Sequence, residues 1–359
     1  MGAGMTDFTK DTPPQNGPQD GQQDGSDEIN VVRHESWECA GTAEIEIGVD
    51  VGGMRVDLVE VPEGSTGEVR VEVRHDPDAG GFFGQGVRGV MNWVSNASSN
   101  WSGGKGFPGF GGSWESGSFE GAPWDAGNWG PGNWDMDRLA AEAVRATEIS
   151  WAEGGRRLVV RSPQQMPLRV VPLSVTVSAP AGSRLAARTG TGDIIVTGRA
   201  GWTALRTGTG RVRADDVDGD LDVQSGSGDV TIAAARGRSR VRTGTGTITV
   251  DAAGGPLDVK AGSGDVLLGR LDGDLDARTG SGDLRVTDVV SGRCDVTTGS
   301  GDLTIGVHEG VWAEVDLSSG SGTARSDLVV NSMPPGGSTA VHLRGRTGSG
   351  DVLVTRARG

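Results

Sequence analysis

The sequence predicts an all-β protein that folds as a single-stranded parallel β-helix, or solenoid, with rungs of about 18 residues. Three observations predict it. A motif of Thr or Ser, Gly, Ser or Thr, Gly recurs nine times, with Ala once in the first place. Each copy holds two short alternating strands and no room for a helix. Gly totals 63 of 359 residues and recurs at fixed corner positions. We also expect an N-terminal β-cap, a long Gly/Trp-rich insertion and one short helix.

The repeat is nearly constant in length from Leu185 onward. Successive second glycines are separated by 18, 18, 18, 18, 18, 19, 21 and 28 residues; they are Gly192, Gly210, Gly228, Gly246, Gly264, Gly282, Gly301, Gly322 and Gly350. A fixed short period of this kind is the signature of a stacked array.

One copy shows why the rungs must stack. Leu221 and Val223 alternate with polar residues before the corner at Gly228, and Val230 and Ile232 alternate after it. Period-two alternation buries one face of each strand. A single rung cannot bury that face alone, so we expect each rung to pair in parallel with the next.

The corners have a backbone cause, because Gly reaches left-handed conformations at low cost. A hydroxyl residue precedes every second Gly, as at Thr191, Ser227 and Ser300. We expect these hydroxyls to bond from rung to rung and to satisfy carbonyls at the corner.

Upstream of the repeat the chain divides by composition. Residues 1–36 read as a disordered acidic leader, since the first 28 residues have almost no large apolar side chain. Residues 37–78 alternate cleanly and read as an N-terminal β segment of the solenoid. Residues 136–184 hold a short helix, expected from Arg138 to Ile149, and leading strands. Residues 185–359 are the solenoid repeats.

Residues 79–135 form a Gly/Trp/Phe-rich insertion without strand or helix period. A long segment of this kind is functional, covering or disordered. Six tryptophans in it are our candidates for partner binding, because exposed aromatic rings bind carbohydrate, peptide or a membrane interface. The same rings could instead cover the flank or the end of the solenoid. They are Trp93, Trp101, Trp114, Trp124, Trp129 and Trp134.

Charge is unevenly distributed along a chain whose net charge is −15. Residues 1–78 carry 18 acidic against 5 basic residues, whereas residues 136–359 carry 26 of each. The acidic excess argues against nucleic acid as the main partner. Residues 1–28 contain no apolar signal segment, and no apolar run approaches the roughly 18 residues of a membrane helix. The sequence therefore predicts a cytoplasmic location and no membrane span.

Three repeat units resemble a known family: Arg188-Thr-Gly-Thr-Gly-Asp193, Arg278-Thr-Gly-Ser-Gly-Asp283 and Arg346-Thr-Gly-Ser-Gly-Asp351. Together with the segment from Val171 to Leu185, they resemble the bacterial adhesin-like β-strand-repeat proteins of unknown function, which are related to toast-rack domains. The resemblance implies a one-chain parallel β-helix and an association with the cell envelope and its stress systems. It carries over no catalytic residue.

A column of Asp follows the corner and is a weak candidate for a calcium site, because stacked carboxylates repel one another and Ca²⁺ takes oxygen ligands. The candidates are Asp265, Asp283 and Asp302. The column is interrupted at Arg211, Thr247 and Thr323, and the motif is not that of calcium-binding β-rolls. We therefore predict no metal and no cofactor.

Catalytic chemistry is not indicated. Carboxylate pairs arise automatically from the repeat, and no rung adds a distinct His or Glu constellation. Cys294 takes a place that Leu holds in other copies, so we expect a core thiol. The predicted function is a non-enzymatic adhesin-like scaffold that binds a protein or carbohydrate partner.

Two alternatives stay open. One is a structural protein that self-assembles by end-to-end stacking into a homo-oligomer, because Val352 and Val354 fall in the last copy and an uncovered end rung invites pairing. The other is a carbohydrate-active enzyme on a β-helix.

Overall fold

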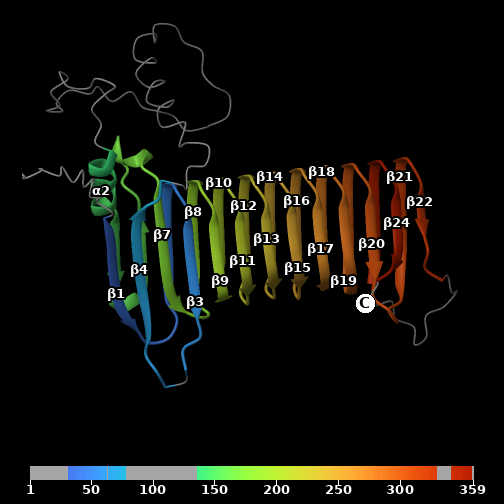
Figure 1. Ribbon diagram of the computed structural model, residues 1–359. Helices are drawn as coiled ribbons and strands as arrows, with labels where there is room; N and C mark the ends of the chain where they lie inside the picture. The colour runs from blue at the N-terminus through green and yellow to red at the C-terminus, as the bar shows by residue number, and fades with distance from the viewer. Residues whose placement is uncertain (1–30, 63, 78–135, 330–340, 358–359) are drawn as a thin grey trace, which may run out of the picture.

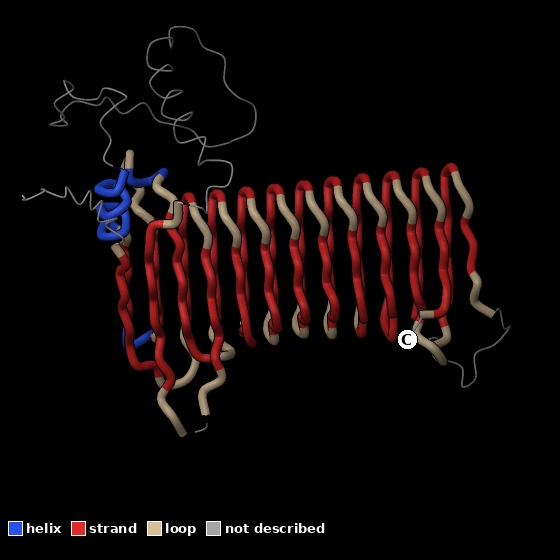
Figure 2. Tube along the Cα trace, viewed as in Figure 1, coloured by secondary structure: helices blue, strands red, loops and turns tan. Residues whose placement is uncertain are grey.

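The computed structural model describes residues 31–62, 64–77, 136–329 and 341–357. These residues form a long two-sheet solenoid, with one strand of each rung in sheet A and the other in sheet B (Figures 1 and 2). Neighbouring rungs of the repeat pair in parallel, with equivalent residues side by side. The predicted fold class is confirmed.

The elements upstream of the repeat include a helix and two short 3-10 turns. They are β1 (Val32–Cys39), β2 (Glu44–Val51), β3 (Met54–Val59), β4 (Gly67–His75), α2 (Met136–Ala146), β5 (Glu148–Ala152), η1 (Glu153–Gly155), β6 (Arg157–Arg161), η2 (Leu168–Val170) and β7 (Leu173–Pro180).

The repeat itself consists of strands alone within the described residues. They are β8 (Arg184–Thr191), β9 (Ile194–Ala200), β10 (Thr203–Thr209), β11 (Val212–Val217), β12 (Leu221–Ser227), β13 (Val230–Ala235), β14 (Ser239–Thr245), β15 (Ile248–Ala253), β16 (Leu257–Ser263), β17 (Val266–Asp272), β18 (Leu275–Ser281), β19 (Leu284–Ser300), β20 (Leu303–Val307), β21 (Ala313–Ser321), β22 (Ala324–Ser326), β23 (Val341–Ser349) and β24 (Val352–Arg356).

The interior is a continuous column of aliphatic side chains between the two sheets. Leu221, Leu257 and Leu275 are each at most 3% exposed, and Val230 and Ile232 are fully buried. Each buried aliphatic side chain of this size stabilises the fold by about 2 kcal/mol. Cys294 is 1% exposed among them, as expected of a core thiol, and burial raises its pKa to about 12.

The corner requires glycine for two reasons. Gly228 has a φ of +127°, and a Cβ atom there would lie 2.1 Å from the carbonyl oxygen of Gly210 in the rung before it. In six copies the first hydroxyl of the motif, rather than the second, donates to a carbonyl of this column, whereas the Ser225 hydroxyl has no hydrogen-bond partner among the described residues and Thr243 donates to Thr245 instead. Thr298, for example, donates from Oγ1 to the carbonyl of Gly282 at 3.1 Å.

The expected role of the second hydroxyl was therefore wrong in part. Thr245 does bond to Ser227 at 3.2 Å and Ser300 to Ser281 at 3.4 Å, so hydroxyls bond from rung to rung. These side chains are exposed, however. The buried hydroxyl two residues earlier lies on the inner side of the corner, where it can reach the carbonyl.

The N-terminal region adds two parallel rungs and a cap. Strands β2 and β3 form one rung, which lies between β8–β9 and the second rung, β6–β7, although β6 and β7 come later in the chain. Beyond β6–β7 the pairing becomes antiparallel, β1 with β4, β4 with β7 and β5 with β6. Helix α2 packs on this end with Ala140, Ala143 and Val144 buried (Figure 1).

Two boundaries differ from the expected ones. Strand β1 starts at Val32, inside the stretch expected as leader. The early start of this strand was not expected because its inward positions carry Arg33 and Glu35 in place of the usual apolar residues. Helix α2 ends at Ala146 instead of Ile149, because Ile149 and Trp151 alternate inward on β5.

The C-terminal end also departs from chain order. Strands β23 and β24 pair with β19 and β20 on one side and with β21 and β22 on the other. The end rung is therefore β21–β22, and the rung with Val352 and Val354, which are fully buried, is the one beneath it. The expectation that Val352 and Val354 lie in the end rung was wrong.

Candidate binding face

The outer face of sheet B carries a column of positive charge. Nine strands place residues in register at one outward position, the residue directly before the corner motif, and six of these residues are cationic while none is acidic. They are Arg188, Arg206, Gln224, Arg242, Lys260, Arg278, Thr297, Arg346 and Ser318. We call this set the Arg column. At a strand spacing of about 4.8 Å it extends for about 38 Å.

The neighbouring column of the same face is mainly acidic. It runs through Asp222, Arg240, Asp258, Asp276, Asp295, Arg344 and Asp316. Several members pair with the Arg column: Arg278 lies 2.9 Å from Asp276, Lys260 lies 3.4 Å from Asp258 and Arg206 lies 3.6 Å from Asp222. These pairs are half-exposed, so they orient the cations without neutralising the face.

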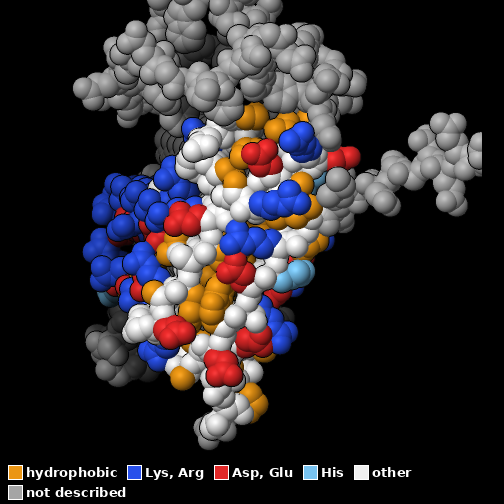
Figure 3. All heavy atoms as spheres, turned by 90° about the vertical axis from the view of Figure 1, so that its left-hand side faces the viewer, with side chains coloured by type: hydrophobic (Ala, Val, Ile, Leu, Met, Phe, Trp, Pro, Cys, Tyr) orange, Lys and Arg blue, Asp and Glu red, His pale blue; other side chains and the backbone are white. Residues whose placement is uncertain are grey.

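Three members of the Arg column have no ion pair within the described part of the chain: Arg188, Arg242 and Arg346. All three side chains are exposed. Viewed along the solenoid from the N-terminal end, Lys and Arg gather on one flank (Figure 3). This flank can therefore offer cations to a partner at the repeat distance of the rungs.

Sheet A presents a different outer face. Its central column holds Arg55, Ile195, Arg213, Thr231, Thr249, Leu267, Arg285, Thr304, Leu353 and Arg325. Leu267 is 40% exposed. The two faces of the solenoid thus differ in degree: the sheet A column has four Arg among Thr and aliphatic side chains, and these Arg are not in consecutive rungs.

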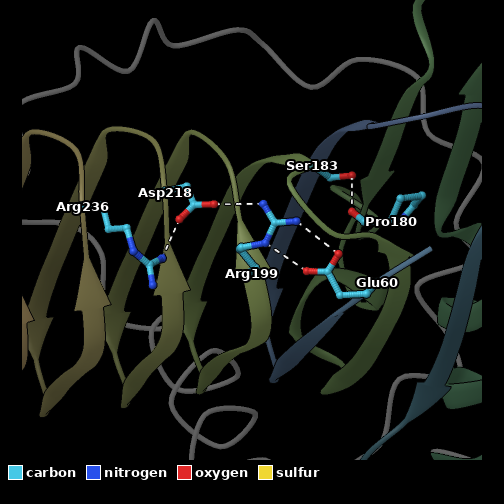
Figure 4. A network of polar contacts seen from close by, with 6 residues as sticks. All are labelled: Glu60, Pro180, Ser183, Arg199, Asp218 and Arg236. Carbon is cyan, nitrogen blue, oxygen red and sulfur yellow. Dashed lines mark hydrogen bonds and ion pairs between the residues drawn. The ribbon is translucent and has the colours of Figure 1, made fainter. Parts of the chain in front are cut away.

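Ion pairs at the ends of successive sheet A strands link neighbouring rungs together. Arg199 on β9 bonds to Glu60 at 2.9 Å and to Asp218 at 3.0 Å, and Asp218 also accepts from Arg236 (Figure 4). The hydrogen bond from Arg199 lowers the pKa of the Glu60 carboxyl, and the same donor is the main cause that lowers the pKa of Asp218. These groups are exposed, so the network orients side chains more than it stabilises the fold.

The calcium candidates have a structural role of their own. Asp265 accepts from the backbone N–H of Asp283 at 2.9 Å, and Asp283 accepts from that of Asp302 at 2.8 Å. Asp302 in turn accepts from Asp351. Each carboxylate therefore links its rung to the next. Among the described residues, no group of three His, Cys, Asp or Glu side chains could hold a metal ion.

The six candidate tryptophans, Trp93, Trp101, Trp114, Trp124, Trp129 and Trp134, lie outside the described residues. Four other tryptophans are described: Trp37, Trp151, Trp202 and Trp312. Trp37 and Trp151 stack with centroids 5.8 Å apart, and Arg184 lies over Trp202 at 5.5 Å from its centroid. The Arg column was not among the candidates expected from sequence; the Arg that recurs just before the corner motif was the signal that could have found it.

The protein-family model for Toastrack DUF4097 matches residues 174–356, which is half of the chain. The chain belongs to this family. The Toastrack region includes every position of the Arg column, from Arg188 to Arg346. No curated protein matches the chain.

Solved structures that are similar to the Toastrack chain match it over most of its length at low identity. A proposed adhesin from Bacteroides fragilis is 10% identical with a TM-score of 0.34, covering 90% of this chain and 97% of that one. A proposed adhesin from Parabacteroides distasonis is 10% identical with a TM-score of 0.35, covering 91% and 98%. A proposed adhesin from Parabacteroides merdae is 11% identical with a TM-score of 0.29, covering 90% and 95%. In the described part of the chain, no helix is long and apolar enough to cross a membrane.

Proposed function

We propose that this Toastrack protein is a non-enzymatic scaffold whose Arg column binds an extended anionic polymer that runs along the solenoid axis. The partner class we favour is an acidic polysaccharide with carboxylates at regular intervals. The observation that carries the proposal is the register of the Arg column: six cations and no acid in nine aligned positions.

The geometry favours a linear partner over a small ligand. The cations lie on a flat sheet face and recur along the rungs, so binding energy accumulates with the length of polymer in contact. The acidic column beside them disfavours a broad polyanion such as a nucleic acid duplex, because its second strand would lie against Asp258, Asp276 and Asp295. A single narrow chain can follow the Arg column and avoid these carboxylates.

The carboxylates that a glycosidase would need are engaged in contacts within the solenoid, which favours a non-enzymatic role. Those after the corner accept backbone N–H groups, and those on sheet B pair with Arg or Lys. Their positions follow from stacking, so we prefer the scaffold to the enzyme alternative. A link to the cell envelope rests on the family resemblance alone.

The test is binding of the full chain to polygalacturonate, with neutral dextran for comparison, by calorimetry at several salt concentrations. The variant combines Arg188→Gln, Arg242→Gln and Arg346→Gln, which breaks no ion pair of the described residues. We expect it to weaken binding about tenfold or more. The matched control combines Arg74→Gln, Arg211→Gln and Arg285→Gln on other faces, which likewise breaks no ion pair of the described residues, and should bind as the parent does.

Three results would overturn the proposal: no binding to polygalacturonate, equal binding by the two triple variants, or affinity that does not fall with salt. A single-stranded oligonucleotide serves as the competing class of polymer. If it binds more tightly than polygalacturonate through the same three arginines, the proposed partner is wrong although the face is right.

A further inference from the structure

The two ends of the solenoid differ in how they meet solvent. At the N-terminal end the edge strands are β1 in sheet A and β5 in sheet B. The inward face of β1 carries Arg33 and Glu35, which pair with each other, and the side chain of Arg33 also bonds to the carbonyl of Thr147. Charges that point inward at an edge prevent further strand pairing. The Trp37–Trp151 stack closes the space between the sheets.

The C-terminal end lacks these devices within the described residues. Strand β21 pairs with β23 on one side, and no described strand pairs with its other edge. Its inward side chains are Ala313, Val315 and Leu317, which are only half-buried although the equivalent residues of inner rungs are buried. An edge strand with an apolar inward face is a template for pairing with another chain.

The end of sheet A continues this open edge with a self-complementary charge pattern. Arg325, Ser326 and Asp327 follow one another, and the N–H of Asp327 bonds to the carbonyl of Val354, so the ladder extends to it. Arg325 and Asp327 are exposed and form no ion pair in the described part of the chain. In antiparallel pairing of two copies about Ser326, each Arg325 lies opposite the Asp327 of the other copy.

Strand β21 tolerates the same symmetry. In antiparallel pairing about Leu317, Asp316 lies opposite Ser318 of the other copy, and Val315 lies opposite Ser319. Neither acid of the strand faces an acid. A two-fold axis perpendicular to the sheets would pair β21 with β21 and β22 with β22.

We propose that two copies of the chain associate tail to tail through the outer edges of β21 and β22. The interface is isologous and closes on itself. Because the N-terminal end is blunted, the dimer cannot add further copies, so the expected end-to-end stacking stops at two. Sheet B of one copy then continues into sheet B of the other. This inference is independent of the proposed polymer binding.

The test uses the full chain in sedimentation velocity over a range of concentrations, with charge reversals at the proposed pair. The parent should show a monomer–dimer equilibrium. Arg325→Asp and Asp327→Arg should each raise the dimer dissociation constant by about tenfold or more, because each places two pairs of like charges opposite one another. The double variant restores opposite charges and should restore the dimer. Arg285→Asp, on an inner rung of sheet A, is the control and should dimerise as the parent does.

Leu317→Lys provides a second probe that does not depend on the charge pair, and it should leave a monomer with unchanged far-ultraviolet circular dichroism. A strict monomer at every concentration would overturn the proposal, and so would a double variant as weak as the single ones. Oligomers that grow with concentration would also contradict it, because a closed interface cannot produce them. Strands of another protein bound at β21 to a monomeric parent would show a different occupant and refute the tail-to-tail dimer.

Discussion

Trp37 stacks on Trp151 with ring centroids 5.8 Å apart and planes inclined by 17°. The contact joins the edge strand of sheet A to the edge strand of sheet B, so it closes the interior at the N-terminal end. No other described part of the chain replaces it if one ring is lost, because β1 and β5 are the outermost strands there.

Trp37→Ala should therefore lower the free energy of unfolding by about 2 kcal/mol, which is less than the cost at a fully buried Trp because Trp37 is half-buried. Urea unfolding followed by circular dichroism measures this. The control is Trp202→Ala, whose ring is 41% exposed and contacts Arg184. It should cost less than about 1 kcal/mol, and equal losses would contradict the closing role of the stack.

The corner hydroxyl can be tested with a neighbouring pair of threonines on β19. Thr298 is 1% exposed and donates to the carbonyl of Gly282, whereas Thr297 faces solvent. Thr298→Val keeps the shape but leaves that carbonyl without its donor, so it should cost about 1 to 2 kcal/mol. Thr297→Val should change stability by less than about 0.5 kcal/mol. A Thr298→Val protein as stable as the Thr297→Val protein would show that the hydroxyl is dispensable.

The corner glycine is expected to be far more sensitive than a strand glycine. Gly228→Ala would force a side chain into a φ of +127° and against the carbonyl of Gly210, so we expect a loss of about 3 kcal/mol or more. A Cβ atom added at Gly48 on β2 would meet no other atom within 4 Å, and Gly48→Ala should be neutral within about 0.5 kcal/mol. Thermal unfolding of the two variants decides between them.

Glu46 gives the fold a small acid sensitivity. Hydrogen bonds from Arg161 and then Arg157 lower the pKa of its carboxyl below the ordinary 4.5. A lowered pKa stabilises the folded state above the ordinary pKa, and this contribution is lost as pH falls through the folded value. Glu46→Gln should therefore reduce the loss of stability between about pH 6 and about pH 3, by less than about 1 kcal/mol because the pair is half-exposed. Glu309→Gln, which is exposed, is the control in the same urea titrations.

Both cysteines should resist thiol reagents in the folded protein. Burial raises the pKa of Cys294 to about 12 and also raises the pKa of Cys39. The thiolate is the reactive form, so iodoacetamide labelling at about pH 8 should be slow until urea unfolds the chain. Mass spectrometry counts the labelled sites, and rapid labelling of Cys294 without denaturant would mean that its rung opens in the native state.

The repeat was predictable from sequence because its period, its alternation and its corner glycines all specify the same rung. Leu221, Leu257 and Leu275 are buried where the alternation places them. The order of rungs at the two ends was not predictable from the period, since a rung fits equally well beside any neighbour of the same shape. The longer spacings of 21 and 28 residues before Gly322 and Gly350 were the sign in the sequence that the last two rungs do not stack in chain order.

The candidate site was predicted less well. The tryptophan candidates fall outside the described part of the chain, and the Asp column proved to link rungs through backbone N–H groups. The Arg column has a trace in the sequence, the basic residue that recurs just before the corner motif at Arg188, Arg278 and Arg346, but only the register of the strands shows that these residues stack on one outer face. The start of strand β1 was also missed, because Arg33 and Glu35 occupy inward positions where the alternation of a strand would place apolar residues. Their charges oppose further strand pairing at this edge and do not form part of the core.

The placement of β23–β24 between β19–β20 and β21–β22 has a consequence for biosynthesis. A ribosome delivers residues 313–326 before residues 341–356, yet the earlier segment has its only described strand partners in the later one. Assembly therefore cannot simply follow the order of translation at this end. The nascent β21–β22 segment must wait for its successor, or first occupy the neighbouring place and then give way to it.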